Sequence, residues 1–212
     1  MLTFQKLLLS EYESYLRAMQ ELTPAVQESI AFAKKIKEKY PTVFYVAGPL
    51  TGVGENEKNR YSLVSTLGKQ CNGFFGYAPH LYGTDPVKHP RVTPSEVHNI
   101  DFLWSVVMAD FHINFGAPIA HGNAIELAWG EMYGIPTALC LPEDMLASRL
   151  LLGMRNIAIL ICYSSECHME KQLQELFEAL QGAQSEGAGV VGFFAQYRFK
   201  QERIASHCPD PV

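Results

Sequence analysis

The chain is 212 residues long, a length typical of one domain, and its 48% hydrophobic residues are enough to build a full core. The formal net charge of −5 argues against a nucleic acid polymer as a partner, because neutralising phosphates requires clustered Lys and Arg. A small anionic ligand held by backbone amides remains compatible with this charge.

The cysteines and the N-terminal pattern indicate the cellular compartment in which the protein resides. Five cysteines stand at irregular spacing without a CxxC pair, at Cys71, Cys140, Cys162, Cys167 and Cys208. Such free thiols, and an N-terminus with the pattern of an amphipathic helix instead of a secretory signal, predict a cytoplasmic location. No run of about 18 uncharged apolar residues occurs, so we expect no membrane span. The histidines lack HExxH spacing, and no metal site is predicted.

The first part of the chain has the periodicity of two helices. Apolar residues recur at three- and four-residue steps over 3–39, with a break before Thr23 and Pro24. Thr23 is the expected N-cap of the second helix and Pro24 its first residue. We therefore predict a helical hairpin over residues 1–40, preceding the main domain at 41–212. We expect the hairpin to cover a subunit interface or a partner site.

The main domain alternates short apolar runs with helical stretches. The predicted strands are 43–47, 73–78, 111–115, 136–141 and 156–162. The predicted helices lie near 57–71, 95–108, 122–133, 143–153 and 165–180, followed by a Gly-rich loop at 182–192 and a helical or frayed end. Strands and helices of this length form right-handed parallel crossover units. The fold class is thus predicted as α/β, a doubly wound, Rossmann-like five-stranded parallel sheet carrying an N-terminal helical hairpin.

Ligands of such sheets bind at the carboxyl ends of the strands, beside the switch point of the strand order. The loops after Ala47, Ala78 and Phe115 are therefore the candidates for a binding crevice. In the first loop Gly48 permits close backbone approach, and we predict that Gly48 and Pro49 contact the substrate. A plain strand-to-loop transition is the alternative. The loop has neither GxGxxG nor GK[ST], so no cofactor is predicted.

The second and third loops add further candidates. His80 comes directly after a strand end and is predicted to face the ligand; a structural role, capping backbone carbonyls, is the alternative. Gly122 and Asn123 are expected to begin the helix that follows the third loop.

Glu126 is the expected nucleophile. It is predicted in the first turn of that helix, where the helix dipole favours a carboxylate and keeps its pKa low. A low pKa suits a nucleophile that must be ionised at neutral pH. A capping-box partner is the alternative role. However, Ile125, Leu127 and Ala128 are apolar, and a carboxylate among apolar residues at a crevice is costly unless it has a function.

A second acid lies on the helix before the third predicted strand. Asp101 is the candidate for acid–base work, whereas Asp110, beside the strand start, is expected only to satisfy backbone amides. Two carboxylates that flank one anomeric carbon are what glycosidic chemistry requires. One forms a covalent glycosyl-enzyme intermediate, and the other protonates the departing base.

Several motifs together resemble the nucleoside 2-deoxyribosyltransferase superfamily, which includes deoxynucleoside 5′-monophosphate N-glycosidases. They are Tyr45-Val46-Ala47-Gly48-Pro49, an acid on a helix, Ala109-Asp110 before a strand and Gly122-x-x-x-Glu126-Leu127-Ala128 after it. The resemblance covers about residues 42–142. It implies a flavodoxin-like fold and retaining glycosyl transfer on a small-molecule nucleoside or nucleotide. It also implies Glu126 as nucleophile, Tyr45 as the hydroxyl that holds it, Asp101 as a contact to the base, and a homo-oligomer, a dimer or larger.

Two positions depart from the superfamily pattern. Ala120 stands six residues before Glu126, where the family has a Ser or Asp that contacts the 5′ end of the sugar. His121 and Asn123 are the candidates to replace that contact, next to Gly122. The gap between Asp101 and the Ala-Asp pair is also one residue longer than in the monophosphate hydrolases.

The sequence leaves several functions open. Transfer and hydrolysis differ only in whether a base or water captures the glycosyl-enzyme, and NAD contains the same type of bond. A nucleotide sensor without turnover is favoured by Ala120, whereas the joint presence of Tyr45, Asp101 and Glu126 favours an enzyme. A scaffold that uses the hairpin as an interaction surface leaves Glu126 unexplained.

Overall fold

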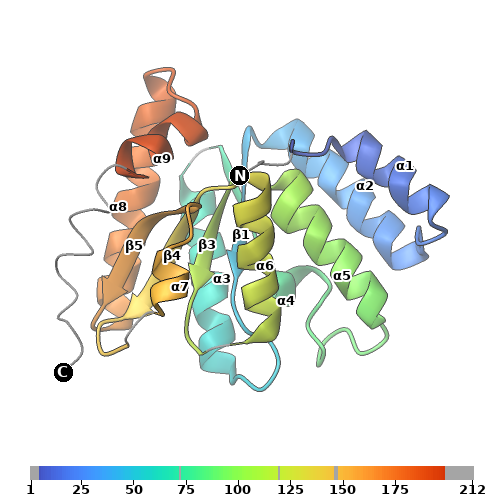
Figure 1. The fold of residues 1–212 in the computed structure, drawn as a ribbon, viewed down its shortest axis with the longest axis horizontal. Helices are drawn as coiled ribbons and strands as arrows, with labels where there is room; N and C mark the ends of the chain where they lie inside the picture. The colour runs from blue at the N-terminus through green and yellow to red at the C-terminus, as the bar shows by residue number, and fades with distance from the viewer. Residues whose placement is uncertain (1–4, 72, 119, 146–147, 199–212) are drawn as a thin grey trace.

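The computed structural model describes residues 5–71, 73–118, 120–145 and 148–198. Its centre is a five-stranded sheet in the order β2-β1-β3-β4-β5, with every neighbouring pair parallel (Figure 1). The strands are β1 (Thr42–Ala47), β2 (Phe74–Tyr77), β3 (Phe111–Phe115), β4 (Thr137–Pro142) and β5 (Ile157–Tyr163). This is the flavodoxin-like strand order. The predicted fold class is confirmed.

The helices follow the alternation that the sequence predicts. They are α1 (Leu9–Ala18), α2 (Pro24–Lys39), α3 (Glu55–Gln70), α4 (Pro79–Tyr82), α5 (Pro94–Phe102), the π-helix η1 (Leu103–Met108), α6 (His121–Tyr133), α7 (Arg149–Leu152), α8 (Glu166–Ser185) and α9 (Val190–Arg198). The predicted helical end is helical as far as Arg198, and its remainder, with Cys208, lies outside the described residues. No helix of the described ranges is long and apolar enough to cross a membrane.

The sheet is buried on both faces, as parallel sheets are. All six residues of β1 are buried, and successive side chains enter different clusters. Phe44 and Val46 pack with residues of α3, α8 and α9, whereas Tyr45 and Ala47 pack with residues of α1, α2 and η1. This double burial explains why the strand is an unbroken apolar run in the sequence and shows no alternation.

The N-terminal hairpin covers part of the sheet of its own domain. α1 and α2 contact α5 and η1, beside which Figure 1 shows them at one end of the molecule. Thr23 accepts a hydrogen bond from the backbone N–H of Val26, which confirms the predicted N-cap. The Trp104 indole donates to Ser29 Oγ at 2.8 Å. A role of the hairpin at a subunit interface stays a prediction, for which the exposed Tyr15 marks the outer face.

Three segments differ from the expected pattern. The loop after β2 contains a short helix, α4, because Pro79 preorganises its first turn. The predicted Gly-rich loop at 182–192 is shorter, since α8 runs to Ser185 and α9 begins at Val190. The helix predicted over 95–108 changes from α to π after Phe102. A π-turn holds one residue more than an α-turn, so η1 would accommodate the extra residue that the resemblance implies between Asp101 and Ala109-Asp110.

If the hairpin belongs to the core, truncating its buried face must destabilise the whole domain. Leu16 is fully buried, and Leu16→Ala should lower the free energy of unfolding by about 2–5 kcal/mol. Tyr15→Ala, on the neighbouring residue that is 54% exposed, should change it by less than about 0.5 kcal/mol. Denaturant unfolding followed by circular dichroism and by tryptophan fluorescence measures both. Equal effects, or a separate early transition for the hairpin, would contradict the shared core.

Candidate active site

A cavity of about 740 Å³ opens at the carboxyl ends of β1, β2 and β3. The strand order reverses here, because the chain leaves β1 toward β2 on one side and returns to β3 on the other. Parallel sheets of this kind form their crevice at that point. The walls come from residues 48–51 after β1, from Pro79 and parts of 84–97 after β2, and from residues 120–126 at the start of α6.

The two carboxylate oxygens of Glu126 differ, because one accepts a hydrogen bond and the other has no partner. Its side chain is buried and lines the cavity. Oε1 accepts a hydrogen bond of 2.6 Å from the hydroxyl of Tyr45, a fully buried residue of β1. Oε2 is buried and has no hydrogen-bond partner. A buried carboxylate oxygen without a partner is costly. It is therefore the atom of this residue whose hydrogen-bonding capacity is unused.

The predicted setting of Glu126 is wrong in one respect. α6 begins at His121, so Glu126 lies in the second turn, beyond the strongest part of the helix dipole. Burial raises its pKa well above the ordinary value, and the negative charge of Asp101 raises it further, while the hydrogen bond from Tyr45 opposes the rise. Burial and a second acid therefore raise the pKa of Glu126, whereas the sequence pattern predicts that a helix end lowers it.

Asp101 of α5 faces the same cavity. Its Oδ1 accepts a hydrogen bond of 3.1 Å from the hydroxyl of Thr84. Burial raises the pKa of Asp101 to about 7, against the opposing effect of the Thr84 and Tyr45 hydroxyls. The pKa of Tyr45 is itself raised well above its ordinary value, first by burial and then by the charges of Asp101 and Glu126. Burial thus raises the pKa of both carboxyl groups, and the charge of Asp101 raises that of Glu126 further.

Gly48 and Pro49 line the cavity, and Tyr61 of α3 explains the glycine. A Cβ atom on Gly48 would lie 2.5 Å from the Tyr61 ring, closer than real contacts allow. The Tyr61 hydroxyl donates to the carbonyl oxygen of Pro49 at 3.2 Å. The glycine therefore lets α3 pack directly beneath the first loop, whether or not its backbone also touches a ligand.

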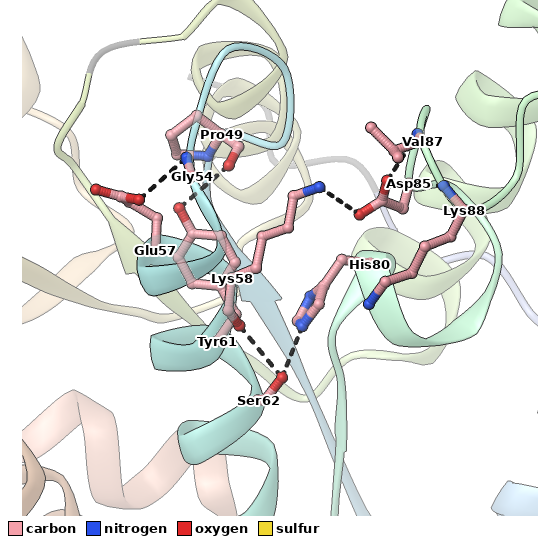
Figure 2. Close-up of polar contacts among 10 residues, drawn as sticks. All are labelled: Pro49, Gly54, Glu57, Lys58, Tyr61, Ser62, His80, Asp85, Val87 and Lys88. Atoms are coloured by element: carbon pink, nitrogen blue, oxygen red, sulfur yellow. Dashed lines mark hydrogen bonds and ion pairs between the residues drawn. The ribbon is translucent and has the colours of Figure 1, made fainter.

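His80 is not brought to the cavity. Its ring is buried against Tyr61, and Nε2 lies 2.7 Å from Ser62 Oγ of α3, as Figure 2 shows. Burial lowers the pKa of His80 to about 4, so the imidazole is neutral at physiological pH. The reason is local, because α4 begins at Pro79 and turns the next side chain toward α3 instead of toward the crevice.

The start of α6 lines the cavity with His121, Gly122 and Asn123. The amide of Asn123 is already used: it accepts from Asn114 Nδ2 at 2.7 Å and donates to the Phe115 carbonyl at 2.8 Å. The N-cap residue Ala120 makes no side-chain cap. Backbone N–H groups of the first turn are hence left for solvent or for an anionic group of a ligand.

Sequence reasoning did not find Thr84 or the ion pair behind it. Lys58 Nζ lies 2.7 Å from Asp85 Oδ2, and both side chains are almost fully buried (Figure 2). Lys58 sits in a strongly polar stretch of α3, where no local pattern marks a buried cation. Within the described residues, no group of three or more His, Cys, Asp or Glu side chains is arranged to hold a metal ion.

The raised pKa of Asp101 predicts how stability depends on pH. Between the unfolded value near 4 and the folded value of about 7, the folded state binds more protons, so stability falls as pH rises. Asp101→Asn removes this penalty. Its stability relative to wild type should increase by roughly 1–3 kcal/mol between pH 4 and pH 8. Chemical unfolding at both pH values measures it; a difference that does not change with pH would contradict the raised pKa.

Comparisons with known proteins agree with the fold. No family model and no curated protein matches the chain. Among solved structures, the CMP N-glycosidase BcmB of Clostridium botulinum is similar, with 20% sequence identity and a TM-score of 0.50 over 64% of this chain and 99% of that one. A conserved protein from Enterococcus faecalis V583 is 18% identical with a TM-score of 0.44, covering 64% of this chain and 98% of the other. The first likeness supports the α/β fold around the cavity.

Proposed function

We propose that this protein cleaves or exchanges the N-glycosidic bond of a nucleoside or nucleotide through a covalent intermediate on Glu126. The observation that carries the proposal is that Glu126 lines the cavity with an Oε2 that has no hydrogen-bond partner and an Oε1 fixed by Tyr45, and that Asp101 lines the same cavity. A nucleophilic carboxylate and a second acid are the two groups that retaining glycosidic chemistry requires.

The proposed reaction has two halves. In the first, Oε2 of Glu126 forms a bond to the anomeric carbon while the bond from that carbon to the base nitrogen breaks. The base leaves with the electron pair of the broken bond and takes a proton from Asp101. In the second half, water or an acceptor base attacks the same carbon, gives a proton to the Asp101 carboxylate, and displaces Glu126.

The two carboxyl groups have different roles in the proposed reaction. Burial raises the pKa of both, which favours the proton that Asp101 must donate, whereas Glu126 must lose its proton to act as the nucleophile. The hydroxyl of Tyr45 donates to Glu126 Oε1, which favours the charge there. The same hydrogen bond fixes the orientation of the carboxylate, whose Oε2 is the atom that we propose attacks the anomeric carbon.

The cavity suits a nucleoside or nucleotide in size and chemistry. Its volume of about 740 Å³ is typical of small-molecule sites. Apolar side chains after β2, among them Pro86, Pro90 and Val92, offer a wall for a planar base. The open backbone amides at the start of α6 offer hydrogen bonds to the opposite, polar end of the substrate.

The fold of a CMP N-glycosidase also supports the proposal. Together with the motifs around Tyr45 and Glu126, it leads us to infer that the chain is a distant member of the nucleoside 2-deoxyribosyltransferase superfamily. We carry over from that family a homo-oligomeric state, a dimer or larger, as a further proposal. Whether water or a base completes the reaction depends on how far the closed site excludes water.

Released base is the decisive measurement. Wild type, Glu126→Ala and Glu126→Gln are incubated with nucleosides, deoxynucleotides, CMP and NAD, with and without an acceptor base, and the products are separated by chromatography. We expect base release by wild type and none by either variant, because both remove the nucleophile. Glu131→Gln, which removes a carboxylate from the same helix outside the cavity, should keep activity.

The same experiment separates the alternatives. Release of nicotinamide from NAD alone would make the protein an NAD glycohydrolase. No release from any compound, with one nucleotide bound and recovered unchanged, would replace the enzyme by a sensor. Release that persists in both Glu126 variants would contradict the nucleophile.

Tyr45→Phe tests the hydrogen bond to Glu126. The change should lower kcat roughly 10- to 100-fold with little change in KM, as expected for loss of one hydrogen bond to a charged group in the transition state. Tyr12→Phe is the matched control, because the Tyr12 hydroxyl makes a buried hydrogen bond of 3.0 Å to the Asn99 carbonyl on the hairpin side. Its kcat should equal that of wild type. Equal losses in the two variants would indicate a general effect on packing.

A further inference from the structure

One buried ion pair lies next to the cavity and takes no part in the reaction proposed above. Lys58 Nζ and Asp85 Oδ2 are 2.7 Å apart, with side chains only 4% and 0% exposed (Figure 2). Lys and Asp are almost never buried to this degree unless they are paired. The desolvation of two charges offsets most of their attraction, so such a pair is a poor device for stability alone. Its geometry indicates a positional role.

Asp85 is held on both carboxylate oxygens. Oδ2 receives the hydrogen bond from Lys58, and Oδ1 accepts from the backbone N–H of Val87 at 2.8 Å and of Lys88 at 3.1 Å. Burial by itself raises the pKa of Asp85, but these three donors outweigh it and lower the pKa below its ordinary value. The charged carboxylate therefore anchors the segment after α4 to the side of α3.

Thr84, the residue before this anchor, reaches the proposed acid. Its own backbone N–H donates to the Pro79 carbonyl at 3.2 Å, and its hydroxyl donates to Asp101 Oδ1 at 3.1 Å. Thr84 is 5% exposed and has little room to move. A continuous path of contacts thus runs from α3, through the ion pair and one peptide unit, to the carboxyl group on α5.

We propose that Lys58 and Asp85 are positioning residues, whose ion pair holds Thr84 where its hydroxyl donates to Asp101 and so sets the ionisation of the proposed acid. The other titratable groups that face Asp101 are Tyr45 of β1, Tyr77 of β2 and Glu126 of α6. Among the described residues, none of these three side chains is hydrogen-bonded to Lys58 or Asp85, so the path through Thr84 is separable from theirs. The inference rests on the proposed function for the role of Asp101, but its effect is measurable without turnover.

The test removes the pair without leaving a lone buried charge. The double variant Lys58→Met with Asp85→Asn keeps the net charge, most of the side-chain length of residue 58 and an oxygen for the two backbone donors. The ionisation of Asp101 is followed by the ¹³Cγ resonance of its carboxyl group, assigned by its loss in Asp101→Asn. We expect the titration midpoint of Asp101 to rise by about 0.5–1 pH unit, the effect of losing one hydrogen bond to a carboxylate.

Thr84→Val removes the last link of the path and should raise the midpoint by a similar amount. Adding Thr84→Val to the double variant should then produce no further rise, because both changes break the same contact. The single variant Lys58→Arg retains a cation opposite Asp85, so its Asp101 midpoint should equal that of wild type. Additive shifts in the triple variant, or no shift in the double variant, would overturn the proposal.

Ser62→Ala is the matched control. Ser62 lies one turn beyond Lys58 on α3, donates to the Lys58 carbonyl at 3.2 Å and contacts His80, but it makes no hydrogen bond to the Lys58 ammonium or to Asp85 (Figure 2). Its loss should leave the Asp101 midpoint unchanged, and a shift equal to that of the double variant would reduce the effect to general loosening of α3. If the double variant does not fold, Asp85→Glu replaces it. That variant keeps both charges but lengthens the anchor, so the midpoint should also rise; an unchanged midpoint would overturn the proposal.

Turnover supplies an independent readout. If base release is observed, the fall of kcat with rising pH should move to higher pH in the double variant by the same amount as the resonance. If the resonance shifts in the double variant but wild type releases no base, the proposed function is contradicted and the positioning role of the ion pair is supported. If wild type releases base but the resonance does not shift, the positioning role is contradicted and the proposed function is supported.

Discussion

The hydrogen bond from Tyr45 to Glu126 joins the middle of the sheet to the helix that lines the cavity. Tyr45 belongs to β1, which is paired with β2 on one side and β3 on the other, at the point where the strand order reverses. The side chain of Tyr45 has no exposed surface. The position of its hydroxyl is therefore fixed by the whole sheet. A carboxylate bound to such a group is preorganised, because orienting it requires no further loss of freedom when a substrate arrives.

The N-terminal hairpin gains a role from this arrangement. It packs on the face of the sheet that carries Tyr45, in one cluster with Tyr77 and Trp104, whose rings stack with centroids 4.1 Å apart. Water is thereby kept from the back of the site. A low local dielectric raises the pKa of a buried carboxyl group and strengthens each hydrogen bond made to it. The hairpin thus contributes to the burial that raises the pKa of Glu126 and Asp101, although none of its described residues lines the cavity.

The periodicity of the sequence was enough to predict the strands, the hairpin and the cap at Thr23, because these depend on neighbours within a few residues. The start of α6 was less predictable: Ala120 carries no capping side chain, so the helix boundary and the pKa of Glu126 depend on packing around them. The pairing of Lys58 with Asp85 joins residues 27 positions apart in polar surroundings. Only the folded chain reveals that both are buried. The orientation of His80 likewise follows from α4, which the loop composition did not indicate.

The π-helix η1 has a consequence for the evolution of the site. Its wide turns separate Asp101 on α5 from β3 by one residue more than an α-helix would use. Because a π-turn holds one residue more than an α-turn, deleting a single residue there would let the segment close into a regular α-helix while α5 and β3 kept their places. The segment before β3 can therefore absorb a change of one residue in its length, and Asp101 would still line the cavity.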